Sequence, residues 1–113
     1  MSTKEQQLAA LEQQIKDAQG SLELGKALAS LRHNADFKKL VIDGYLKNEA
    51  VRLVHLKSDP SMSSADNQAA VVRDIDAIGA LAQFFRTVEM MGTRAESSIA
   101  EAEQAITEIH EEE

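Results

Sequence analysis

The sequence contains no cysteine and no tryptophan, only one proline and five glycines, and aromatic residues make up 4% of it. The absence of cysteine excludes disulfides, thiolate metal sites and a cysteine nucleophile. The shortage of aromatic and turn-forming residues argues against an all-β sandwich or barrel. The few glycines form no phosphate-binding loop of the kind that α/β enzymes use. The 113 residues therefore predict a small, acidic, alanine-rich, all-α protein with a single domain.

Long apolar runs are also missing. The N-terminus is polar and has no signal-peptide core. The longest nearly apolar run is Ala77 to Ala82, whereas a membrane span needs roughly 20 such residues. We therefore expect no membrane contact and a protein that stays in the cytoplasm where it is made.

The spacing of apolar residues predicts three helices, over residues 1–33, 36–57 and 64–110. In the first helix, Ser2 and Glu5 have capping-box spacing. Its apolar positions then recur at alternating steps of three and four residues, which is typical of a coiled coil. These positions are Leu8, Leu11, Ile15, Ala18 and Leu22.

The second predicted helix is apolar around most of its circumference, a pattern typical of a central helix in a bundle. Asp36 is its expected N-cap, and the Asp59–Pro60 pair ends it because the residue before proline disfavours helix. Ser63 or Ser64 is expected to cap the third helix.

The apolar stripe of the third helix slips by one step between Phe85 and Val88, as at a stammer. We expect either one long helix or two helices hinged near Gly92. Beyond Gly92 the stripe is narrow and alternates small with β-branched side chains, which favours a close helix pair. Its members are Ala95, Ile99, Ala102, Ile106 and Ile109.

These patterns predict an elongated three-helix bundle or a helical hairpin with coiled-coil-like N- and C-terminal arms. The arms need a partner, because an isolated apolar stripe rarely holds a helix in water. We favour self-association, in which the arms pair with another copy. The alternative is a monomeric hairpin whose arms pair with each other through bends at Gly20, Gly25 and Gly92.

Charge is distributed unevenly along the chain, whose net charge is -7. From Arg94 onward there are seven glutamates and one basic residue, whereas Arg32 to Lys57 holds six basic and three acidic residues. A basic middle and an acidic tail could meet head to tail between copies, or the tail could serve only solubility. The acidic total and the mixed charges of the second helix argue against direct nucleic-acid binding.

No constellation of catalytic or metal-binding residues stands out. His33, His55 and His110 do not share metal-ligand spacing, and Asp74 and Asp76 point apart on a helix. We therefore expect no enzymatic activity, no cofactor and no metal. A bulky apolar cluster near the suspected hinge predicts either core packing or a docking patch for a partner. It consists of Phe84, Phe85, Met90 and Met91.

Two stretches, Asp36 to Pro60 (DFKKLVIDGYLKNEAVRLVHLKSDP) and Arg73 to Phe85 (RDIDAIGALAQFF), resemble uncharacterised small helical proteins of tailed bacteriophages. Such proteins are associated with head and virion-assembly genes, and the resemblance covers about half of the chain. It implies a virion component or an assembly factor that acts in the cytoplasm of an infected bacterium or is incorporated in the particle.

Three functions follow as hypotheses. The first is a self-associating, non-enzymatic structural or assembly component that contacts itself and other virion proteins through its arms. The second is a phage inhibitor of a host nuclease or defence protein, which would present the acidic tail or the Phe84–Met91 patch. The third is a DNA-packaging recognition subunit, which the missing basic recognition helix disfavours.

Overall fold

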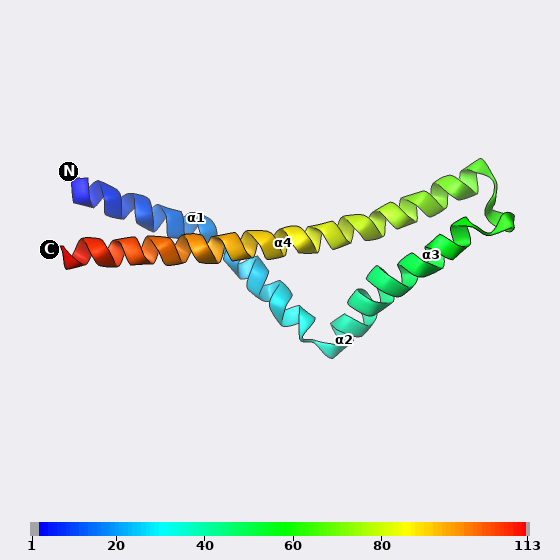
Figure 1. Ribbon diagram of the computed structural model, residues 1–113, viewed down its shortest axis with the longest axis horizontal. Coiled ribbons are helices and arrows are strands. Elements are labelled where there is room, and N and C mark those ends of the chain that lie inside the picture. The colour runs from blue at the N-terminus through cyan, green and yellow to red at the C-terminus, as the bar shows by residue number, and fades with distance from the viewer. Residues whose placement is uncertain (1–2, 113) are drawn as a thin grey trace. The chain divides into compact units, whose positions relative to one another are not determined.

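The computed structural model describes residues 3–112, and every regular element in this range is a helix, which confirms the all-α class. η1 is a π-helix and η2 a single turn of 3-10 helix. Figure 1 shows the elements, which in chain order are α1 (Thr3–Arg32), α2 (Ala35–Phe37), η1 (Lys38–Glu49), α3 (Ala50–Lys57), η2 (Pro60–Met62) and α4 (Ala65–Glu111).

The chain forms two compact units, and α4 contributes to both. Unit 1 comprises Met1–Leu28 and Val88–Glu113, and unit 2 comprises Ala29–Thr87. α4 passes through Gly92 as one helix of 47 residues, without the break that the sequence left open. The boundary between the units falls where the apolar stripe slips by one step.

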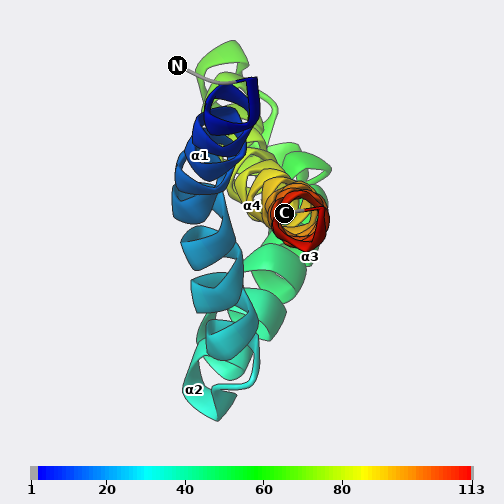
Figure 2. The ribbon, with the colours of Figure 1, turned by 90° about the vertical axis from the view of Figure 1, so that its left-hand side faces the viewer.

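Unit 1 is an antiparallel pair formed by α1 and the C-terminal part of α4. Gln14 contacts Ser98 and Gly25 contacts Gly92, so residue numbers rise along one helix as they fall along the other. The blue end of α1 and the red end of α4 accordingly lie at the same end of this unit (Figure 1). Figure 2 looks nearly along the end of α4 and shows α1 passing beside it.

Unit 2 packs η1 and α3 against the first part of α4. Its core is small and centres on three buried residues, Leu53, Val71 and Ile78. The half-buried residues packed around them are Leu46, Ala50, Leu56, Met62 and Ile75. Phe37 of α2 adds an edge-to-face contact with Phe85 of α4, at 6.0 Å between ring centroids. The core thus joins residues that are far apart in the sequence.

The observed helix caps differ in part from those expected. Asn34, and not Asp36, caps the second helical segment, because its side-chain oxygen accepts a hydrogen bond from the backbone N–H of Phe37 at 2.9 Å. Ser64 caps α4 by accepting from the N–H of Asn67 at 3.1 Å. The helix therefore begins one turn after the proline, as the capping pattern indicated.

The connection between α3 and α4 is held by two side chains. Asp59 accepts a hydrogen bond from the backbone N–H of Ser61, and this bond lowers the pKa of the Asp59 carboxyl group. A lowered pKa means that the contribution of this bond to stability is present at neutral pH and is lost as the pH falls through that pKa. The amide of Gln68 donates to the carbonyls of Lys57 and Met62, at 2.9 and 2.8 Å.

The prediction that the second helix is central in a bundle is wrong. The Leu40 side chain is 74% exposed, and Val51 and Val54 are 51% and 56% exposed. The physical reason is that η1 and α3 pack against α4 on one side in the core of unit 2, so the apolar residues on the other side of the segment stay exposed. Gly44 fits this segment because a Cβ there would lie 2.9 Å from the carbonyl oxygen of Lys39.

Candidate functional site

The two predicted arms pack against each other within unit 1. Of the two arrangements that the sequence left open, the structure therefore has the one in which the arms pair within the chain. Ala95 and Ala102 are 5% and 1% exposed, which makes them part of the core. The other predicted contact residues of the arms are half-buried, namely Leu8, Leu11, Ile15, Leu22, Ile99, Ile106 and Ile109.

Two glycines set the closest approach of these helices. A Cβ built on Gly25 would lie 3.0 Å from the Cα of Gly92, and a Cβ on Gly92 would lie equally close to the Cα of Gly25. A methyl group at either position would press on the opposite backbone, so glycine allows the two helices to cross in contact. Gly20, by contrast, has nothing within 4 Å of its Cβ position.

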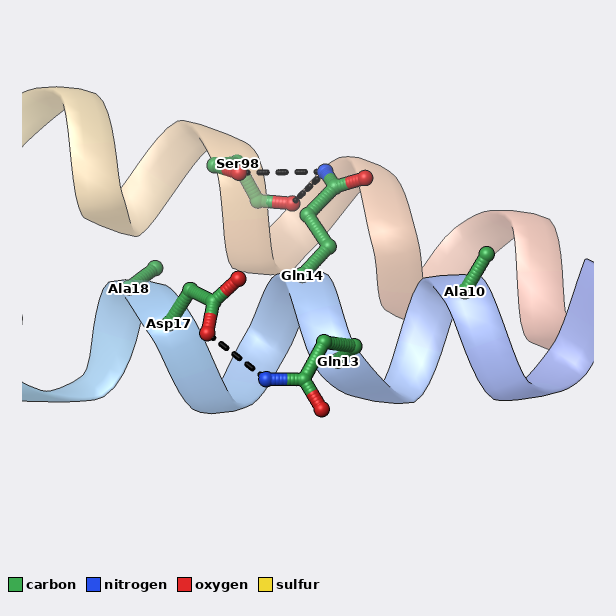
Figure 3. Close-up of a pocket in the computed structure, with 6 residues that line it drawn as sticks. All are labelled: Ala10, Gln13, Gln14, Asp17, Ala18 and Ser98. Carbon is green, nitrogen blue, oxygen red and sulfur yellow. Dashed lines mark hydrogen bonds between the residues drawn. The ribbon is translucent and has the colours of Figure 1, made fainter.

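A side-chain hydrogen-bond contact links α1 and α4 across the helix pair. The Gln14 amide donates to both the carbonyl oxygen and the hydroxyl oxygen of Ser98, each at 3.0 Å. Figure 3 shows these bonds beside a shallow open hollow of about 550 Å³ and the exposed bond from Gln13 to Asp17 on the same helix. Ala10 and Ala18 are among the residues that line this hollow. The Gln14 contact fixes the alignment of the two helices.

Replacing Gln14 with alanine is expected to destabilise unit 1 by about 1 kcal/mol, because two part-buried hydrogen bonds are lost. The matched control is Gln13→Ala, which removes only an exposed bond to Asp17 and is expected to change stability by less than about 0.5 kcal/mol. Urea denaturation of both variants measures the difference. Equal losses would contradict a structural role for the contact with Ser98.

The predicted cluster of phenylalanine and methionine does not form a single buried core. Phe85 is half-buried and packs on Phe37 in unit 2, whereas Phe84 is 56% exposed. Met90 and Met91, which belong to unit 1, are both exposed. Exposed methionine adapts readily to irregular surfaces, so these residues remain available for contact with a partner.

The outer side of η1 and α3 combines exposed apolar residues with basic ones. Lys47 lies one turn before Val51 on this side, and Leu40 is exposed near its start. The Arg52 guanidinium donates to the Glu49 carboxylate, which raises the Arg52 pKa and neutralises one basic charge locally. The remaining lysines of the segment, which have no carboxylate of the described residues within ion-pair distance, are Lys38, Lys39, Lys47 and Lys57.

The two units differ strongly in charge. Within the bounds of unit 1 there are 4 basic and 12 acidic residues, a net charge of -8. Within those of unit 2 there are 8 basic and 7 acidic residues, a net charge of +1. The net negative charge of the protein therefore comes entirely from the helix pair of unit 1.

Residues 3–112 contain no group of three or more histidine, aspartate or glutamate side chains placed to hold a metal ion. No helix in the same range is both long and apolar enough to cross a membrane. Comparison with protein-family models, with curated proteins and with solved structures finds no match to this chain.

Sequence reasoning missed the most specific contacts of unit 1. The sequence predicts bends at Gly25 and Gly92, although each glycine continues the alternating three-and-four spacing of its stripe. Gly25 follows Leu22 by three residues and Gly92 follows Val88 by four, which places both glycines in the seam between the helices. This spacing was the available signal. The contact between Gln14 and Ser98 had no comparable signal in the sequence.

Proposed function

We propose that this protein is a non-enzymatic, self-associating structural or assembly component of a tailed-phage particle. One observation carries the self-association: among the described residues, seven apolar residues are buried while ten large apolar side chains are exposed. A core of this size gives a small domain little stability. A second copy that covers part of the exposed apolar surface would remove that surface from water and so stabilise the fold.

The phage context rests on the resemblance of Asp36–Pro60 and Arg73–Phe85 to small phage proteins. In that context the protein acts in the cytoplasm of the infected bacterium or inside the particle. Unit 1 would serve as a rigid, acidic helix pair, and its charge of -8 would keep it soluble while directing it toward basic partners.

The first test is the solution mass, measured by light scattering on a sizing column over a range of protein concentrations. The expected result is an oligomer whose mass rises with concentration. Mass spectrometry of purified phage particles then tests the structural role, and we expect the protein in fixed stoichiometry with the other particle proteins. A monomer at every concentration would contradict self-association, and absence from particles would restrict the protein to an assembly factor.

The acidity of unit 1 favours a second candidate function, inhibition of a host protein that has a basic surface. Nucleases and other nucleic-acid-processing proteins carry such surfaces. Affinity purification from host cells followed by mass measurement separates the two functions. Inhibition predicts a salt-sensitive complex of fixed stoichiometry with one host protein, whereas the first proposal predicts recovery of copies of the same chain.

A further inference from the structure

The exposed side of η1 and α3 is here called the basic face. It carries lysine side chains together with solvent-exposed apolar side chains. Lys47 precedes Val51 by four residues and Val54 by seven, so the three side chains lie on the same side of the helix. Asp43 is the one exposed acidic residue in this segment, because Glu49 is half-buried and bound to Arg52. The basic face consists of Lys38, Lys39, Leu40, Lys47, Val51 and Val54.

The outward side of α4 in unit 1, here called the acidic face, has the complementary arrangement. It lies opposite the buried Ala95 and Ala102, and its centre is a row of exposed, uncharged residues at helical spacing. That row is Ser97, Ala100, Gln104 and Thr107. Exposed glutamates flank the row on both sides, with Glu96 and Glu103 on one side and Glu101 and Glu108 on the other.

We propose that the basic face of one copy binds the acidic face of a second copy, an inference that rests on the proposed self-association. Pairing either face with itself would bring like charges together, whereas pairing one with the other places lysines beside glutamates. The apolar side chains of the basic face can then pack on this uncharged row, in the manner of a ridge entering a groove.

This contact uses two different surfaces of the chain, so it is heterologous and leaves one face unused on each member of a pair. Further copies add to the unused faces until the assembly closes into a ring or extends as a filament. The interaction is also sensitive to salt, because exposed charges are screened over about 8 Å at physiological ionic strength and about 3 Å at 1 M.

Charge reversal on each face tests this pairing in the full-length protein. The basic-face variant carries Lys39→Glu and Lys47→Glu, and the acidic-face variant carries Glu101→Lys and Glu108→Lys. All four side chains are exposed, so the fold should persist, as far-ultraviolet circular dichroism can verify. Each variant alone should associate at least about tenfold more weakly than the wild type in sedimentation-velocity measurements.

A mixture of the two variants should recover the wild-type affinity, because each reversed face then meets an opposite charge on the other variant. The matched controls are Arg73→Glu in unit 2 and Glu23→Lys in unit 1, which reverse exposed charges outside the two faces and should leave association unchanged. Controls that weaken association as much as the test variants would overturn the proposal in favour of a general effect of net charge.

Two further outcomes separate this inference from the function on which it rests. If the wild type associates but the variants and their mixture behave like it, the proposed pairing of faces is overturned and self-association stands. If the wild type stays monomeric at every concentration, self-association itself fails. A third outcome would also overturn the proposal. If the sedimentation coefficient changes with salt but not with protein concentration, the two faces meet within one chain and not between copies.

Discussion

Leu53→Ala is expected to lower the free energy of unfolding by about 2–5 kcal/mol, the range measured for buried leucines in other proteins. Leu53 is 2% exposed and lies in the core of unit 2 with Val71 and Ile78. This core is small, with three buried residues and five half-buried ones packed around them, so few side chains can move into the cavity. The free energy of unfolding of native proteins is only about 5–15 kcal/mol, so this substitution is expected to remove a large share of the stability.

The matched control for this prediction is Leu40→Ala, which deletes the same atoms from a side chain that is 74% exposed. Its expected effect on the monomer is within about 0.5 kcal/mol. Urea denaturation followed by circular dichroism, at protein concentrations low enough to prevent association, measures both variants. Equal destabilisation by the two substitutions would show that Leu53 is not the centre of the unit 2 core.

Gly25→Leu is expected to destabilise the helix pair of unit 1 by about 1–3 kcal/mol, the cost usually found when a packed site is overfilled. The side chain would start 3.0 Å from the Cα of Gly92, against a backbone that belongs to the opposite helix and cannot rotate away. The helices would have to separate at this crossing. Faster hydrogen exchange of the α1 amides and a lower melting temperature would report the separation.

Gly20→Leu is the matched control in the same helix. Its Cβ meets nothing within 4 Å, so the change acts only through helix propensity, which improves by about 0.8 kcal/mol when leucine replaces glycine. The two substitutions are thus expected to have opposite signs. A stabilising effect of Gly25→Leu would contradict the close crossing of α1 and α4.

Several features of the structure could be predicted from single segments of the sequence. The 3-4 spacing from Leu8 to Leu22 predicted a long first helix, and the Asp59–Pro60 pair predicted where the second helical segment ends. The slip between Phe85 and Val88 was also visible, and it coincides with the boundary between the two units. Such signals are local, because helix periodicity and capping depend on neighbouring residues alone.

The candidate surfaces were less accessible to prediction. The sequence left open whether the arms pair with another copy or with each other, and in the structure the stripe around Ile15 packs in the same unit as the stripe around Ile99. An apolar stripe shows that a helix needs a partner but not which one, because packing between helices is similar for any stripe of matching width. The exposure of Leu40 could not be predicted either, since it depends on which side of η1 faces the core of unit 2.

The all-helical class, most helix ends and the concentration of negative charge near the C-terminus follow from the amino-acid sequence alone. The packing of the helices was needed to show that Gly25 and Gly92 meet at a helix crossing, that Gln14 binds Ser98, and which apolar residues of the second helical segment remain exposed. The difference lies in the distance along the chain over which each property is set. Helix formation and charge are properties of adjacent residues, whereas contacts between helices depend on how two distant segments align, which no local pattern specifies.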